Sequence, residues 1–145
     1  MRFDILDKKT IIKKTVEKME FNKGGEVSSR LKNILSRLGI SPANIRRAAI
    51  VCYELEINII IHSEGGFIKA DINNKQLSII AEDTGPGIAD VKKALQPGFS
   101  TAGHKIRELG FGAGMGLNNV KKYSDELLID TDFGKGTRVK AVIIF

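Results

Sequence analysis

The segment SPANIRRAAIVCYELEINIIIHS occupies residues 41–63 and is apolar along most of its length. Its Ser41–Pro42 start is typical of a helix, with serine as the N-cap and proline at the first helical position. Apolar residues then recur at helical spacing in two stripes, Ile45, Ala48, Cys52, Leu55 and Ile59 in one and Ile50, Tyr53, Ile57, Ile60 and Ile61 in the other. A helix that is apolar on most sides is buried on most sides, so we predict a buried helix that ends near Ser63.

One polar line, formed by Glu54, Asn58 and His62, interrupts this apolar helix. Glu54 and Asn58 are four residues apart and therefore share one helix face. A carboxylate can accept a proton from a hydroxyl, and a carboxamide oxygen is a suitable ligand for Mg²⁺. Taken alone, however, the pair favours a partly exposed polar stripe at the outer edge of the helix, and His62 alone favours a structural histidine.

Upstream of this helix, EVSSRLKNILSRLG at 26–39 places its apolar residues on one face and ends in Gly39, a typical residue just past a helix end. Residues 2–6 and 15–21 show weak strand patterns. Downstream, FIKADI at 67–72 and QLSIIAED at 76–83 predict two strands joined by a turn.

The C-terminal half continues with two predicted helices, ADVKKAL at 89–95 and LNNVKKYS at 117–124. Residues 125–145 then predict a closing hairpin. This order of elements predicts an α+β fold, a two-layer sandwich in which a mixed, mostly antiparallel sheet carries its helices on one face. At 145 residues the chain is long enough for one domain with one core, which we assign to 1–145.

The composition, with 42% hydrophobic and 28% charged residues, is that of an ordinary soluble globular protein. Cys52 is the only cysteine, which excludes an internal disulfide and a multi-cysteine metal site and fits a reducing, cytoplasmic compartment. Neither a secretory apolar block nor an apolar run of about 20 residues occurs, so we expect no membrane association. Residues 1–50 hold 12 Lys/Arg and 5 Asp/Glu. This excess of positive charge favours a solvated basic face over a binding surface for an acidic partner or a nucleic acid.

A carboxylate followed by glycines, DTGPG at 83–87, comes directly after a predicted strand. The carboxylate of Asp83 can accept a hydrogen bond from an amino group such as that of adenine, and glycine lets a planar ligand approach the backbone. Pro-Gly is also a strong turn signal. The spacing alone supports a binding site and a tight turn equally.

A glycine run, GFGAGMGL at 110–117, leads into the predicted helix at 117–124. The free N–H groups at a helix N-terminus make a good phosphate site. The run contains neither a Walker A loop nor a dinucleotide fingerprint, so we interpret it as a glycine-rich lid. DFG at 132–134 and GKGT at 134–137 fall within the predicted hairpin and are interpreted as turns.

Taken in order, these motifs are E-x-x-x-N on a buried helix, D-x-G-x-G after a strand, a glycine run into a helix, and Gly-Thr opening a late strand. The set resembles the GHKL superfamily of ATP-binding domains, which have the Bergerat fold. Within it, roughly residues 15–145 resemble the small bacterial serine/threonine kinases of sigma-factor partner switching, the anti-sigma factors and switch kinases. GFSTAG at 98–103 is similar to the switch-kinase branch.

The resemblance implies a role for each matching residue. Glu54 would be the general base, Asn58 would hold Mg²⁺, and Asp83 would bind the adenine amine in a pocket shaped by Gly85 and Gly87. Thr137 would support Asp83 near adenine, often through water. The remaining ATP-binding positions that it implies lie in the lid and at the start of the helix after it: Ser100, Thr101, Gly112, Gly114, Met115, Gly116 and Leu117. The segment GHKIREL at 103–109 departs from the family pattern and lengthens this lid.

The function that the resemblance implies is an ATP- and Mg²⁺-dependent serine/threonine protein kinase of a partner-switching regulatory system. Its partners would be a regulatory protein with a Ser/Thr phospho-acceptor, of the anti-anti-sigma kind, and a sigma factor or other target; a homodimer is compatible with this. Two alternatives stay open: a non-catalytic nucleotide-dependent protein-binding switch, and a stand-alone histidine-kinase-like ATPase domain. A nucleic-acid-binding module, based on the basic N-terminal third, is disfavoured.

Overall fold

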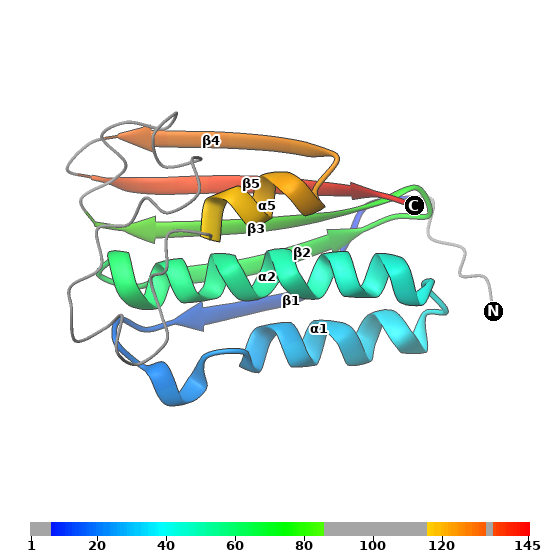
Figure 1. Cartoon of the computed structure of the whole chain (residues 1–145), viewed down its shortest axis with the longest axis horizontal. Helices are drawn as coiled ribbons and strands as arrows, with labels where there is room; N and C mark the ends of the chain where they lie inside the picture. The colour runs from blue at the N-terminus through cyan, green and yellow to red at the C-terminus, as the bar shows by residue number, and fades with distance from the viewer. Residues whose placement is uncertain (1–6, 86–115, 133–134) are drawn as a thin grey trace.

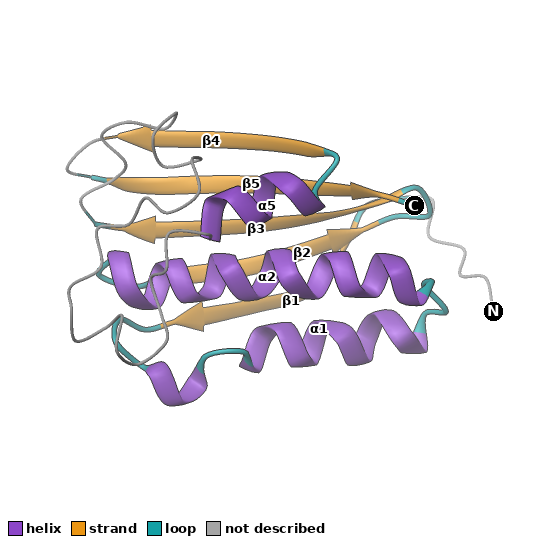
Figure 2. Ribbon diagram, in the orientation of Figure 1, coloured by secondary structure: helices purple, strands orange, loops and turns teal. Residues whose placement is uncertain are grey.

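The computed structural model describes residues 7–85, 116–132 and 135–145. Within these ranges the chain forms two layers, a sheet and a set of helices that all lie over one of its faces (Figure 1, Figure 2). The predicted α+β sandwich is therefore confirmed. The predicted strand at 2–6, the predicted helix at 89–95, the 103–109 segment and the predicted lid up to residue 115 lie outside the described residues.

The sheet has five strands in the order β1-β2-β3-β5-β4. Every pair of neighbouring strands among the described residues is antiparallel. The C-terminal hairpin places β5 in the middle of the sheet, next to β3, and β4 at the edge. The strands are β1 (Lys9–Val16), β2 (Gly66–Ile72), β3 (Gln76–Thr84), β4 (Glu126–Asp132) and β5 (Gly136–Ile144).

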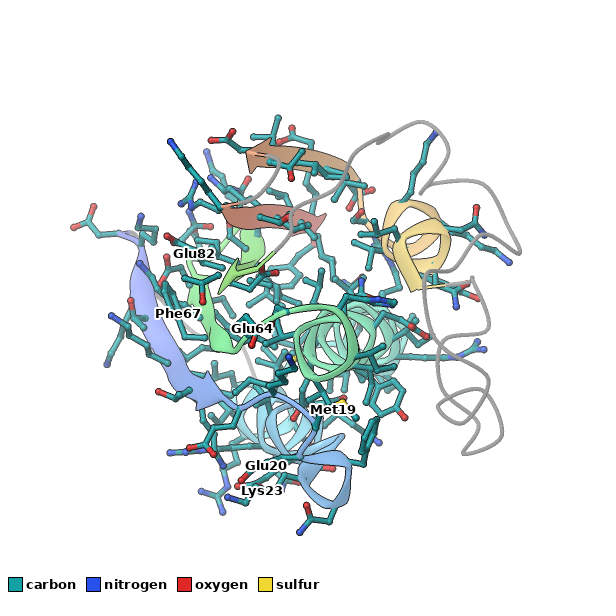
Figure 3. All side chains as sticks on the ribbon, turned by 90° about the vertical axis from the view of Figure 1, so that its left-hand side faces the viewer. Met19, Glu20, Lys23, Glu64, Phe67 and Glu82 are labelled. Carbon is teal, nitrogen blue, oxygen red and sulfur yellow. The ribbon has the colours of Figure 1, made fainter. Side chains whose placement is uncertain are left out.

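The first strand lies earlier in the chain than the pattern at 15–21 predicted. β1 ends at Val16, and Phe21–Lys23 forms a short 3-10 helix. Between them Met19 has a φ of 61°, and its N–H donates to the carbonyl of Ile60 at 2.9 Å. This bond draws the chain from the sheet to the end of α2, where Figure 3 shows Met19. The strand pattern at 15–21 was therefore overridden by a tertiary contact.

The helices are α1 (Glu26–Arg37), α2 (Pro42–His62) and α5 (Gly116–Tyr123). Ser41 caps α2 as predicted, because its side chain accepts the N–H of Asn44 at 3.3 Å. Gly39 follows α1 with a φ of 79°, a conformation that glycine adopts without strain. Figure 1 shows α2 between α1 and α5, in front of the sheet. No helix among the described residues has the length and apolarity needed to cross a membrane.

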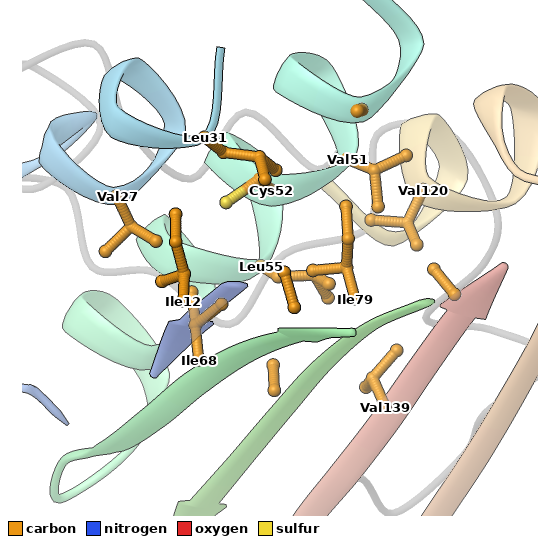
Figure 4. Packing of buried hydrophobic residues seen from close by; sticks show 14 of the residues in the cluster. Ile12, Val27, Leu31, Val51, Cys52, Leu55, Ile68, Ile79, Val120 and Val139 are labelled. Carbon is orange, nitrogen blue, oxygen red and sulfur yellow. The ribbon is translucent and has the colours of Figure 1, made fainter. Parts of the chain in front are cut away.

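The core lies between the two layers, and α2 contributes to it along most of its length. Figure 4 shows Val51 and Leu55 of α2 facing Ile79 and Val139 of the sheet, with Val120 of α5 beside them. All five side chains are at most 5% exposed. Burial of a large aliphatic side chain contributes about 1.5–3 kcal/mol. This packing fixes the rotation of α2, and with it the direction of the polar residues on its remaining side.

Candidate active site

Two polar side chains of α2 lie directly against the first residue of α5. A Cβ atom added to Gly116 would be 3.1 Å from Asn58 Oδ1 and 3.3 Å from Glu54 Oε2. The bare backbone at the start of α5 therefore closes over both side chains. Three of the sequence-predicted site residues, Glu54, Asn58 and Gly116, meet at this point.

The carboxylate of Glu54 has a partner on α5 that the sequence analysis missed. Asn119 Nδ2 donates to Glu54 Oε1 at 3.4 Å, a long hydrogen bond. Burial raises the pKa of Glu54, and the bond from Asn119 lowers it. A carboxylate whose pKa is raised is a better proton acceptor near neutral pH. Asn119 is three residues after Gly116, so the helical period was the signal that would have placed both residues on one face.

The second part of the site is formed by Asp83 on β3 and Thr137 on β5. The two residues are opposite each other in the ladder, and the N–H of Thr137 donates to Asp83 Oδ1 at 3.3 Å. Burial raises the pKa of Asp83, and this bond lowers it. The hydroxyl of Thr137, in turn, lies 3.1 Å from that of Thr131 on β4. The structure thus brings Asp83 and Thr137 together, through a direct main-chain contact.

Two glycines near Asp83 allow other parts of the backbone to approach closely. Gly85 N donates to the carbonyl of Lys135, and a Cβ at Gly85 would lie 3.1 Å from the Cα of Ser63. A Cβ at Gly136 would lie only 2.2 Å from the carbonyl oxygen of Asp83. In the sequence Gly136 was interpreted as part of a turn and as the glycine of the Gly-Thr pair that opens a late strand. In the structure it permits the close approach of β5 to the end of β3.

The two parts of the site lie at the same end of the molecule. Thr84, next to Asp83, exchanges hydrogen bonds with the segment that follows α2: Glu64 N donates to Thr84 O at 2.7 Å, and Thr84 N donates to Gly65 O at 3.1 Å. Figure 1 shows the end of β3, the end of α2 and the start of α5 on the left-hand side. Leu117 is the second residue of α5 at this end. The other predicted ATP-binding positions lie outside the described residues: Gly87, Ser100, Thr101, Gly112, Gly114 and Met115.

The donor set at this end fits Mg²⁺ only in combination with a ligand that supplies further oxygens. Among the described residues no group of three or more His, Cys, Asp or Glu could hold a metal ion. Mg²⁺, however, commonly takes one or two protein oxygens and completes its shell with phosphates and water. Asn58 Oδ1 offers such an oxygen beside the N-terminus of α5, where anionic groups are favoured.

Two other polar residues of α2, Glu56 and His62, are buried or partly buried. Glu56, which the sequence analysis did not identify, is only 2% exposed and accepts the N–H groups of Gly25 at 3.2 Å and Val27 at 3.4 Å, at the start of α1. Its position four residues from Cys52 and from Ile60, both in the predicted apolar stripes, was the signal for its burial. His62 is partly buried at the end of α2, and burial lowers its pKa.

Comparison with known proteins assigns this chain to a family. The chain belongs to the histidine kinase-, DNA gyrase B- and HSP90-like ATPases, whose family model matches residues 43–144. The predicted membership of the GHKL superfamily is therefore confirmed.

The chain is also similar to individual proteins. The chain is 36% identical over 115 residues to the serine/threonine-protein kinase RsbT of Bacillus subtilis (strain 168), over 77% of this chain and 80% of that protein. It is 39% identical over 88 residues to the anti-sigma F factor of Thermoanaerobacter sp. (strain X514), over 61% of this chain and about half (54%) of that protein. A chain of the SiaB-SiaC complex from Pseudomonas aeruginosa shares the fold, with a TM-score of 0.63 at 15% identity, over 92% of this chain and 89% of that one.

Proposed function

We propose that this protein is an ATP- and Mg²⁺-dependent serine/threonine protein kinase that controls a partner-switching regulatory system of the anti-sigma or switch-kinase kind. The observation that carries the proposal is the packing of Glu54 and Asn58 against the first residue of α5. In this proposal Glu54 is the proton acceptor, Asn58 is the magnesium ligand, and the N-terminus of α5 beside them favours phosphate. The names of the relatives, a serine/threonine-protein kinase and anti-sigma factors, support the choice of substrate.

The proposed roles follow from the contacts at each part of the site. ATP, when bound, supplies the phosphoryl group that is transferred. Asp83, held by Thr137 N–H, accepts a hydrogen bond from the adenine amine through its carboxylate. Asn58 holds Mg²⁺ through its side-chain oxygen. The remaining positions are proposed from the family resemblance alone: Ser100, Thr101, Gly112, Gly114, Met115 and Leu117 would bind the phosphates, and Gly87 would adjoin the adenine.

Glu54 takes the proton in the proposed transfer. As the acceptor hydroxyl oxygen of the partner forms its bond to the γ-phosphorus, its O–H bond breaks and the proton passes to the Glu54 carboxylate. The bond between the γ-phosphorus and the bridging oxygen breaks, and that oxygen leaves with ADP. Positioning and electrostatic stabilisation supply most of the catalysis of such a step.

Calorimetric titration with ATP and Mg²⁺ tests the nucleotide part of this proposal. We expect Asp83→Asn to weaken ATP binding about tenfold or more. The asparagine oxygen can still accept the N–H of Thr137, but its amide NH₂ then replaces the oxygen that accepts a hydrogen bond from the adenine amine. Glu82→Gln is the matched control: Glu82 is the preceding residue on β3 and pairs with the exposed Arg138 at 3.8 Å, and Figure 3 shows it beside Phe67. No binding by the wild type would refute the proposal.

Single-turnover transfer from labelled ATP tests the kinase part. The acceptors to be tested are regulatory proteins of the anti-anti-sigma kind that carry a candidate serine or threonine. Transfer by the wild type is expected, and Glu54→Gln is expected to transfer about 10²-fold more slowly, with a residual rate that can still be measured. Binding of ATP and of a partner without any transfer would instead support the non-catalytic switch.

A further inference from the structure

Helix α5 is hydrogen-bonded to α2 at its C-terminal end and in its middle. At its C-terminal end Arg47 of α2 donates through Nε to the carbonyl of Tyr123 at 3.2 Å, and through Nη2 to Asp125 Oδ2 at 2.6 Å. Asp125 also accepts the N–H of Ile144 on β5 at 2.7 Å. In the middle of the helix, Asn119 donates to Glu54. The position of α5 along α2 is thus fixed by contacts on either side of its one fully buried residue, Val120.

Both oxygens of the Glu54 carboxylate face α5, but in different ways. Oε1 accepts the amide of Asn119 at 3.4 Å. Oε2 points to Gly116, where even a methyl group would come within 3.3 Å. A side chain with several rotatable bonds loses conformational freedom when one of its oxygens is bound. The bond to Oε1 therefore selects one direction for Oε2.

We propose that Asn119 is a positioning residue for the phosphotransfer: it holds Glu54 through Oε1 and so directs Oε2 toward the acceptor hydroxyl. This inference rests on the proposed kinase function and adds to it a residue outside the family motif described above. A general base must be within hydrogen-bond distance of the proton that it takes, so a fixed carboxylate direction contributes to the rate. A hydrogen bond to a charged, half-buried acceptor is also stronger than one between neutral groups.

The experiment compares Asn119→Leu with Asn118→Leu, the same substitution at the neighbouring asparagine of the same helix, which is also partly buried. We expect Asn119→Leu to lower the single-turnover transfer rate about tenfold or more, since a misplaced catalytic group has effects of this size. The dissociation constant for ADP with Mg²⁺, measured by calorimetry, is expected to change less than about twofold, because the proposed role of Asn119 affects the transfer step and not the binding of the nucleotide. Asn118→Leu is expected to change neither quantity by more than about twofold.

Two further variants separate positioning from a loss of fold. Asn119→Asp has the same shape but no donor and adds a negative charge beside Glu54, so its rate is expected to fall below that of Asn119→Leu. Both rates are measured under conditions where urea unfolding shows the variants to be folded. In a Glu54→Gln background, Asn119→Leu is expected to cause no further loss of rate, because its effect passes through Glu54.

Each outcome has a distinct meaning. Transfer by Asn119→Leu at the wild-type rate, an equal loss in ADP affinity, or independent losses in the double variant would overturn the positioning role and leave the kinase function standing. A wild type that binds ATP but transfers no phosphate to any tested partner would overturn the proposed function itself, and the positioning role with it.

Discussion

The Asp83 carboxylate on β3 receives the main-chain N–H of Thr137 on β5, so the neighbouring strand fixes one of its oxygens. Because the donor is a backbone group, the contact depends on the alignment of the two strands more than on the side chain at 137. That alignment places Thr84 opposite Gly136, the residue just before Thr137. The geometry around Asp83 is therefore sensitive to changes at Gly136.

Gly136→Ala is expected to lower both the free energy of unfolding and the affinity for ATP. Gly136 has a φ of 149°, and a Cβ there would lie 2.2 Å from the Asp83 carbonyl, so the strands must separate. A loss of about 2 kcal/mol or more is expected by urea unfolding. Gly39→Ala, also at positive φ but in an exposed position, is the control and should cost about 1 kcal/mol without any change in ATP affinity. Equal effects of the two substitutions would contradict the close approach of β5 to β3.

Gly116→Ala is expected to separate activity from stability. Alanine is the better helix former, so the free energy of unfolding should change by less than about 1 kcal/mol. The added methyl group, however, would press on Glu54 and Asn58, and the transfer rate should fall about tenfold or more. Thermal unfolding and single-turnover transfer, measured on the same preparation, check the two parts. A variant with full activity would show that the start of α5 does not border the reacting groups.

Glu56→Ala is expected to destabilise the protein by about 2–4 kcal/mol, because it leaves buried N–H groups at the start of α1 without their acceptor and opens a cavity. Glu64→Ala is the matched control: Glu64 is exposed and pairs with Lys18, and it should cost less than about 1 kcal/mol. Urea unfolding measures both. ATP affinity should be unchanged in Glu56→Ala under conditions where it is folded. A loss at position 56 no larger than that at position 64 would be inconsistent with the capping contact.

Asp125→Asn is expected to change the dependence of stability on pH. The N–H of Ile144 and the guanidinium of Arg47 lower the pKa of Asp125, so the folded state favours the ionised form. The stability from these contacts is therefore present above the unfolded-state pKa, near 3.9. It is lost as pH falls below that value through the folded-state pKa. Asp125→Asn should unfold at lower urea than the wild type at pH 7, and the difference should shrink below about pH 4.

Arg47→Met provides the complementary measurement, because it removes the charged partner and keeps Asp125 with its bond from Ile144. It should lower stability at pH 7 and retain part of the acid-dependent loss. If the difference between wild type and Asp125→Asn stayed constant from pH 7 to about pH 3, the ionised form of Asp125 would not be the stabilising one.

The parts of the fold that depend on local signals could be predicted from the sequence. Ser41 and Pro42 fix the start of α2, and the helical period places Glu54 and Asn58 on one face. The alternation of side chains in β3 likewise puts Asp83 on the same face as the core residues Ile79 and Ala81. These features need no knowledge of the rest of the chain.

The remaining features depend on residues far apart in the sequence. The bond from Asn119 to Glu54 joins residues 65 positions apart, and the end of β1 depends on the contact of Met19 with Ile60. Glu56 looked like one more polar residue of α2 because its acceptor role depends on where α1 begins. The spacing of residues along the sequence does not predict such contacts, because they form only when the helices pack on the sheet.

The position of α5 depends on contacts with two different parts of α2. Arg47, with Asp125 and Ile144, holds the C-terminal end of the helix, and Glu54 holds Asn119 in its middle. The wall against Glu54 is therefore kept in place by contacts among the described residues.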